Sequence, residues 1–183
     1  MHLIFLHGDA GVGKSTIAKE LAKELGFPFL NFQHLASLLG PVFGYSSATY
    51  SGLRNLTTQM VIEHALKNQE DGIICSVTFD SATPLEDFRA HIDAAKESGC
   101  IGLFVGLTCE ENELKIRATK PSRRHDDISD LQLLEESLSS GGFEIPELPG
   151  PSITIDSTGE SPEQTTQNII AMLPESMKKT ISF

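Results

Sequence analysis

The 183-residue sequence is short of positive charge. It carries 14 Lys and Arg against 25 Asp and Glu, which gives a formal net charge of −11 at pH 7. A molecule this negative repels phosphate at long range, so non-specific binding to nucleic acid or to an anionic membrane is unlikely to be its main role. Any anionic ligand must therefore be captured by a local positive site.

Cysteines and long apolar runs are also scarce. The three cysteines (Cys75, Cys100 and Cys109) form no C-x-x-C pair, which argues against a disulfide framework or a structural zinc site. No run approaches the roughly 20 apolar residues that span a bilayer. The apolar stretch at residues 3–6 is too short for a signal-peptide core. We therefore expect a cytoplasmic protein with neither a membrane nor nucleic acid as its partner.

The proportions are those of a globular chain, with 39% hydrophobic and 21% charged residues. Its length suits one domain over residues 1–183, and the sequence contains no internal repeat and no linker that would divide it. A monomer or a homodimer is expected.

Short apolar runs alternate with helical patterns along the chain. Strands are predicted over residues 2–7, 29–32, 73–79, 101–107 and 153–155, and helices over 15–25, 53–69, 87–96, 110–119, 128–139 and 162–173. Residues 40–52 and 140–151 are predicted loops, and the last ten residues a loose tail. Five apolar strands alternating with helices predict an α/β fold whose parallel sheet is covered on both faces.

One motif provides the local positive site. Residues 8–15, GDAGVGKS, fit the phosphate-binding P-loop pattern G-x-x-x-x-G-K-[ST], between a predicted strand and a predicted helix. Its glycines let backbone N–H groups turn inward around a phosphate, and the start of the helix adds further N–H groups. Lys14 supplies charge for the β- and γ-phosphates, and the Ser15 hydroxyl is the expected ligand of Mg²⁺. The expected nucleotide-binding residues are Gly8, Asp9, Ala10, Gly11, Val12, Gly13, Lys14, Ser15 and Thr16.

The segment GDAGVGKSTIAKELA resembles the small P-loop kinases, which include shikimate, gluconate and adenylate kinases and chloramphenicol phosphotransferase. The element order is similar to that family over nearly the whole chain, including an arginine-bearing segment that ends at Arg124. The resemblance implies a three-layer P-loop fold with a five-stranded parallel sheet of order 2-3-1-4-5 and a short lid at about residues 117–127. It also implies ATP and Mg²⁺ as cofactors and a small-molecule acceptor as the partner.

Three arginines lie where the family carries its lid arginines, namely Arg117, Arg123 and Arg124. The resemblance implies that each could act as a catalytic residue that stabilises the transferring phosphoryl group after the lid closes. The alternative for Arg117 is a solvated helix residue paired with Glu113 at i,i+4.

The sequence departs from the family at the ends of two strands. Shikimate and gluconate kinases carry an aspartate pair after the second strand, whereas this chain has Asn31 and Gln33 there. Amides form hydrogen bonds but do not accept a proton as a base. The third strand has Ser76 or Thr78 where the family has its Walker B aspartate, and Asp80 follows. Asp80 is a catalytic candidate, as a base or as a water-mediated Mg²⁺ ligand; equally, it could cap a turn.

Four other polar residues have two interpretations each. His34 is a second candidate base, although a lone histidine is more often an ordinary surface or core residue. Asp9 either contacts the acceptor or is a tolerated loop residue. Arg54 and Arg89 could bind an acceptor anion, but their predicted helical positions favour solvent exposure. The aromatic side chains of the 40–52 loop (Phe43, Tyr45 and Tyr50) line the acceptor pocket or cover the core.

Together these features predict an ATP-dependent kinase for a small-molecule acceptor. The glycine order G-x-x-G-x-G disfavours a dinucleotide-binding site, which has G-x-G-x-x-G. A nucleotide-hydrolysing switch is an alternative, although the sequence has no N-K-x-D guanine motif. The other alternative is a kinase-like protein that binds ATP without turnover, which the missing aspartates favour.

Overall fold

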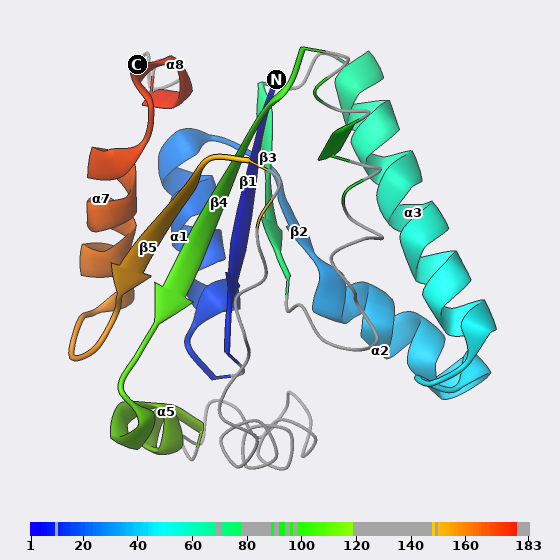
Figure 1. The fold of residues 1–183 in the computed structure, drawn as a ribbon, viewed down its shortest axis with the longest axis horizontal. Coiled ribbons are helices and arrows are strands. Elements are labelled where there is room, and N and C mark those ends of the chain that lie inside the picture. The colour runs from blue at the N-terminus through cyan, green and yellow to red at the C-terminus, as the bar shows by residue number, and fades with distance from the viewer. Residues whose placement is uncertain are drawn as a thin grey trace.

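Five parallel strands form the centre of the fold (Figure 1). The computed structural model describes residues 1–9, 11–68, 71–77, 89, 92–93, 96, 99–118, 148 and 150–178. The sheet has the order β2-β3-β1-β4-β5, which confirms the predicted α/β class and strand order. The strands are β1 (His2–Gly8), β2 (Phe29–Asn31), β3 (Gly72–Ser76), β4 (Ile101–Thr108) and β5 (Ser152–Asp156).

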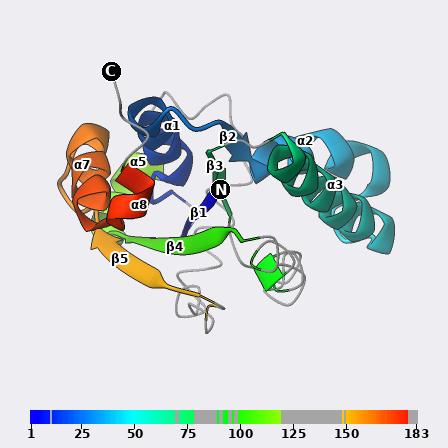
Figure 2. The ribbon, with the colours of Figure 1, turned by 90° about the horizontal axis from the view of Figure 1, so that it is seen from above.

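Helices cover both faces of this sheet. Helices α1 (Lys14–Leu25) and α7 (Pro162–Met172) pack against each other on one face, with α3 (Ala48–Lys67) on the opposite side (Figure 2). The remaining helices are α2 (Phe32–Phe43), α5 (Glu111–Ala118) and the single turn α8 (Glu175–Lys178). No described helix is long and apolar enough to cross a membrane.

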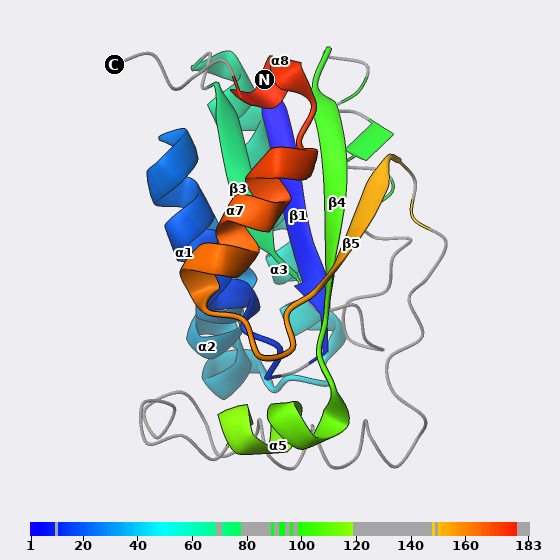
Figure 3. The same ribbon diagram turned by 90° about the vertical axis from the view of Figure 1, so that its left-hand side faces the viewer.

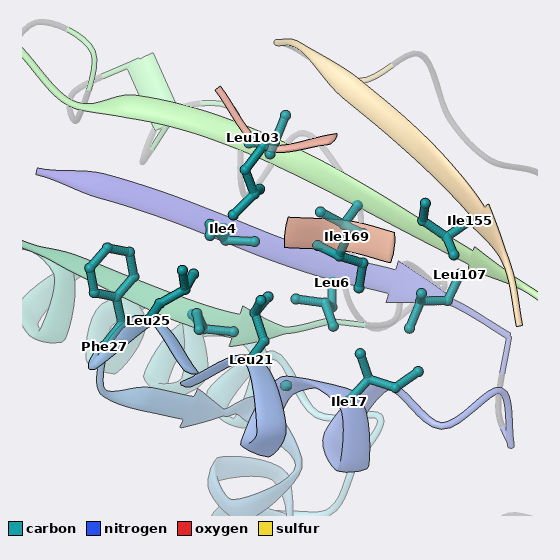
Figure 4. Close-up of a cluster of buried hydrophobic side chains, with 14 of the residues drawn as sticks. Ile4, Leu6, Ile17, Leu21, Leu25, Phe27, Leu103, Leu107, Ile155 and Ile169 are labelled. Atoms are coloured by element: carbon teal, nitrogen blue, oxygen red, sulfur yellow. The ribbon is translucent and has the colours of Figure 1, made fainter. Parts of the chain in front are cut away.

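The alternation of side chains along β1 divides the interior into two cores. Ile4 and Leu6 point toward α1 and α7, where they meet Ile17, Leu21 and Ile169 (Figure 4). Leu3 and Phe5 point to the other face, in a second core that includes Phe104 and the α3 residue Ile62. Because β1 is buried on both faces, it is fixed at the centre of the sheet, and the loop that follows it is held on a rigid support.

All five strands end at the same edge of the sheet (Figure 3). The P-loop follows β1, α2 follows β2, and α5 follows β4 at this carboxyl edge. Register pairing sets Asn31 beside Ser76, and Ser76 beside Leu6, two residues before the P-loop begins. The topology therefore places the ends of β2, β3 and β4 at the same edge as the phosphate-binding motif, where open α/β sheets bind their ligands.

Two sequence predictions about loops are wrong. Residues 40–52 are largely helical, because α2 continues to Phe43 and α3 begins at Ala48, five residues earlier than predicted. Gly40 and Pro41 made the end of α2 look like a loop in the sequence. Pro41 is tolerated in the last turn of the helix because its missing N–H removes only one hydrogen bond. The last ten residues include α8, whose Met177 is fully buried. The predicted helices at 87–96 (in large part) and 128–139 lie outside the described residues.

Candidate functional site

The P-loop backbone adopts conformations that need glycine. Gly8, Gly11 and Gly13 have φ angles of 142°, 85° and 104°. A Cβ atom on Gly8 would lie 2.3 Å from the backbone oxygen of Leu107 on the neighbouring strand. The loop therefore tolerates no side chain at Gly8, and its tight exit from β1 follows from the glycine pattern of the sequence.

Helix α1 starts from this loop, and none of its own side chains offsets the positive end of its dipole. Its N-cap is Gly13, which contributes no side-chain hydrogen bond, and no acidic residue occupies the first turn. The backbone N–H groups of Thr16 and Ile17 both donate to the Gly13 oxygen at 3.0 Å. The positive end of the helix dipole is thus available to an anion, as at other phosphate-binding helix starts.

Lys14 lies over the loop. Its Nζ donates to the backbone oxygens of Gly8 and Asp9, both at 2.8 Å. The Asp9 oxygen also accepts from the Val12 N–H at 3.3 Å, which closes the turn. Ser15 is partly exposed and Thr16 is exposed at the start of α1. Ala10, the remaining predicted member of the loop, lies outside the described residues.

Arg117 connects α5 to the P-loop. Its Nε donates to the Glu113 carboxylate at 2.9 Å, so the i,i+4 pair considered for the sequence is present. Its Nη1 donates to the Val12 oxygen and to the Ser157 hydroxyl, both at 3.0 Å, and its Nη2 donates to the Ser157 oxygen at 2.6 Å. The guanidinium is therefore not solvated: it fixes the P-loop against the segment that follows β5.

The segment that follows β5 anchors Arg117. The buried Ser157 donates through its N–H and its hydroxyl to the Thr108 oxygen, at 2.9 and 3.0 Å. The Asp156 carboxylate accepts from the Thr158 N–H and hydroxyl, and these hydrogen bonds lower the pKa of Asp156. The Ser157 hydrogen bonds join the ends of β4 and β5, which are 49 residues apart in the sequence, so local sequence patterns could not reveal them.

Neutral groups lie at the ends of β2 and β3. The Asn31 side-chain oxygen caps α2 by accepting from the Gln33 N–H at 3.0 Å, and it also accepts from the Ser76 hydroxyl at 3.1 Å. Ser76 is buried, whereas Gln33 and His34 are exposed at the first turn of α2. Asn31 thus has a clear structural task where the related kinases carry a carboxylate.

His7 is a residue that the sequence analysis passed over. It lies on β1 just before the P-loop, is 3% exposed, and packs edge-on against Phe104 with 6.3 Å between ring centroids. Burial, with a smaller contribution from the Lys14 ammonium, lowers the pKa of His7 to about 4. The imidazole is therefore neutral at pH 7 and adds no charge beside the loop.

Of the other candidate residues named from the sequence, Arg54 differs from expectation and Arg89 agrees with it. Arg54 is 8% exposed, so the expectation that it is solvated is wrong: its Nη1 donates to the Tyr50 hydroxyl, and its guanidinium lies 5.7 Å from the Tyr50 ring centroid. Tyr50 itself is buried, and Arg89 is exposed as expected. Asp80, Arg123 and Arg124, with most of the proposed lid, lie outside the described residues.

Comparisons with known proteins agree with this architecture. A family model described as an AAA domain matches residues 4–135. A sugar kinase from Janibacter is 17% identical with a TM-score of 0.66, over 100% of this chain and 98% of that one. A gluconokinase from Sinorhizobium meliloti is 17% identical with a TM-score of 0.59, over 97% and 91% of the two chains. The APS kinase CysC from Mycobacterium tuberculosis, solved with AMPPNP and APS, is 15% identical with a TM-score of 0.57, over 93% and 95%.

No curated protein sequence matches the chain. At 15–17% identity, the three solved structures show a shared fold, which is that of small-molecule P-loop kinases.

Proposed function

Because the chain belongs to the AAA domain family and has the fold of small-molecule P-loop kinases, we propose that it is an ATP-dependent phosphotransferase for a small-molecule acceptor. One observation carries the proposal. The glycine turn after β1 leads into an uncapped helix N-terminus, with the Lys14 ammonium held above it by two backbone oxygens. This is the cationic, N–H-rich cradle that an acidic chain needs to bind a triphosphate.

The residues present fit ATP with Mg²⁺. When bound, ATP supplies the phosphoryl group and Mg²⁺ offsets part of its negative charge. Lys14 would exchange its two backbone oxygens for phosphate oxygens, and the partly exposed Ser15 hydroxyl would ligate the metal. The loop N–H groups would hold the phosphates in place without having to reorganise, because the glycine conformations are already set.

Arg117 acts in this proposal chiefly as a positioning residue. Its guanidinium binds the Val12 oxygen on one side and Ser157 on the other, so it keeps the loop in register with the end of β5. It also brings a permanent positive charge next to the loop, since arginine stays protonated. Arg123 and Arg124 keep the role that the family resemblance implies, as lid arginines. Asp80 stays a candidate base or water-mediated Mg²⁺ ligand, with a turn-capping role as the alternative.

The comparisons support a transferase over the alternatives. The three similar structures are a sugar kinase, a gluconokinase and an APS kinase, and the last was solved with AMPPNP. The neutral Asn31 and Gln33 do not rule out transfer, because phosphoryl transfer asks mainly for positioning and electrostatic stabilisation. The acceptor would bind at the ends of β2 and β3, which we call the acceptor side and define as Asn31, Gln33, His34 and Ser76 with helices α2 and α3.

The test is ADP release from MgATP with and without a panel of metabolites, nucleosides and antibiotics as acceptors. A phosphotransferase releases ADP only when an acceptor is added. Equal release without any acceptor would identify a nucleotide-hydrolysing switch instead. Thermal stabilisation by MgATP with no ADP under any condition would identify a binding protein without turnover. Lys14→Ala should abolish the stabilisation in all three cases.

A further inference from the structure

Formal charge is almost absent from one long stretch of the chain. Between Glu24 and Glu63 there are 38 residues, and Arg54 is the only Asp, Glu, Lys or Arg among them. At the average of 21% charged residues for this chain, a stretch of that length would carry about eight. The stretch includes β2, α2 and the first 15 residues of α3, which is most of the acceptor side.

This uncharged stretch adjoins the nucleotide cradle. Asn31 at the end of β2 pairs in register with Ser76, and Ser76 pairs with Leu6, two residues before Gly8. Neighbouring strands lie about 4.8 Å apart, so the end of β2 is about 10 Å from the end of β1. In Figure 1, α2 leaves this edge from the end of β2, and α3 then runs from the far end of α2 back toward the opposite edge of the sheet. A small molecule bound next to a phosphate on the P-loop would therefore meet this stretch.

Arg54, the single charged residue of this stretch, is buried and contacts Tyr50 of the same helix, α3. It is 8% exposed, its Nη1 donates to the Tyr50 hydroxyl at 3.2 Å, and its guanidinium lies over the Tyr50 ring. The next turn of the helix continues the same buried stripe, with the Thr58 hydroxyl donating to the Arg54 backbone oxygen at 2.9 Å. The stretch accordingly presents no formal charge to a ligand at the surface.

The acceptor side contains amides, a hydroxyl, an imidazole and aliphatic side chains. Asn31 and Ser76 form a hydrogen-bonded pair at the strand ends, and the side chains of Gln33 and His34 are exposed beside them. Helix α2 also exposes Leu38 and Val42, four residues apart on one face, at 68% and 71%. Amides, a hydroxyl and aliphatic side chains bind hydroxyl groups and apolar carbon well, but they do not neutralise a carboxylate or a phosphate.

We propose that the acceptor is an uncharged hydroxyl compound, recognised by the neutral hydrogen-bonding groups at the ends of β2 and β3; this inference rests on the phosphotransfer proposed above. An anionic acceptor would approach a triphosphate in a molecule of net charge −11, with no exposed cation on the described acceptor side to offset the repulsion. Among the described residues, Lys14 and Arg117 both donate to backbone oxygens of the P-loop, and we call the P-loop (residues 8–15) with Arg117 the nucleotide side.

The phosphoryl transfer does not require a carboxylate on the acceptor side. The bond between the γ-phosphorus and the β,γ-bridging oxygen breaks, and a new bond forms between that phosphorus and the acceptor hydroxyl oxygen. ADP leaves with the bridging electrons, and the hydroxyl proton passes to water. In a loose transition state the hydroxyl needs little activation before the phosphorus is reached, so a neutral surface is compatible with catalysis.

The experiment uses matched compounds that share a skeleton and differ in charge: glucitol with gluconate, methyl shikimate with shikimate, and adenosine with AMP. ADP release from MgATP gives kcat/KM for each member. Thermal shift in the presence of Mg–AMPPNP reports binding independently of turnover. In the pair that reacts or binds best, we expect kcat/KM for the neutral member to be at least tenfold higher than kcat/KM for its anionic partner. Equal values, or a preference for the anion, would overturn the inference.

A charge-introducing variant sharpens the test. Gln33→Arg replaces an exposed amide in the first turn of α2 by a cation, and should raise kcat/KM for the anionic members by about tenfold relative to that for their neutral partners. Gln167→Arg is the matched control, since it makes the same substitution at an exposed position of α7, on the opposite face of the sheet from α3 (Figure 2). An effect of the same size in both variants would contradict recognition at the strand ends. If MgATP itself fails to stabilise the protein, the proposed phosphotransfer fails rather than the choice of acceptor.

Discussion

At the carboxyl edge of the sheet, the nucleotide side and the acceptor side are built from different groups. The nucleotide side combines glycines with positive φ angles, the Lys14 ammonium and the Arg117 guanidinium, all tied to backbone oxygens. The acceptor side combines an amide, a hydroxyl and the stretch of residues 25–62, whose one charged residue, Arg54, is buried. In the described part of this acidic chain, two cations therefore lie at the loop after β1, while residues 25–62 beside it carry a single buried charge.

The largest expected effect is on the charge of the nucleotide side. Lys14→Met removes the ammonium and should lower kcat/KM by about a hundredfold to a thousandfold, because a preorganised donor to a transferring group is worth that much. MgATP should no longer raise the melting temperature. Lys19→Met, on the exposed face of the same helix, is the control and should keep both properties. An active Lys14→Met protein would remove the distinction between the two sides.

The next effect concerns the backbone of the nucleotide side. Gly8→Ala places a Cβ 2.3 Å from the Leu107 oxygen at a φ of 142°, so we expect a loss of about 3 kcal/mol or more in the free energy of unfolding. Gly26→Ala is the comparison, at a φ of 69° with nothing within 4 Å of the new Cβ, and should cost about 1 kcal/mol. Urea denaturation of both variants measures the difference. Equal losses would show that the close contact with β4 is unimportant.

The buried imidazole at the exit from β1 predicts a pH effect on stability. The pKa of His7 is about 4 in the folded protein and near 6.5 when unfolded, so between these values the unfolded chain binds more protons. The contribution of His7 is therefore intact above pH 6.5 and declines as the pH falls to 4, by about 3 kcal/mol in total. His7→Gln should flatten this part of the unfolding profile. His34→Gln, which removes an exposed imidazole, is the control, and a profile that both variants change equally would contradict the assignment.

The smallest expected effect concerns the hydrogen bonds by which Arg117 joins the P-loop to the segment after β5. Arg117→Gln removes the donors to the Val12 oxygen and to Ser157, and should raise KM for ATP by about tenfold, equivalent to about 1.4 kcal/mol. If Arg117 acts mainly by positioning the loop, kcat should fall less than KM rises. Lys115→Gln, whose partner Glu111 is an exposed neighbour on the same helix, serves as the control. A drop confined to kcat would instead place the guanidinium on the transferring group.

The sequence predicts the nucleotide side better than the acceptor side. A P-loop is a local pattern whose residues are adjacent, and apolar strands alternating with helices are enough to predict a parallel sheet. Arg117 was recognised, but its partners Val12 and Ser157 lie 105 and 40 residues away, so its hydrogen bonds are visible only in the fold. Arg54 looked like a surface residue because helical periodicity counts every arginine as polar, whereas Tyr50 provides a buried partner one turn earlier. Helix α2 lacks charged residues, so no polar stripe marks it in the sequence.

Calorimetric titration of the protein with MgATP tests the central claim most directly, because everything on the acceptor side presupposes a triphosphate on the loop after β1. The account predicts saturable binding at one site per chain in the wild type, and heat that is nearly abolished in Lys14→Met but retained in Lys19→Met. Absence of binding to the wild type, or unchanged binding to Lys14→Met, would contradict it.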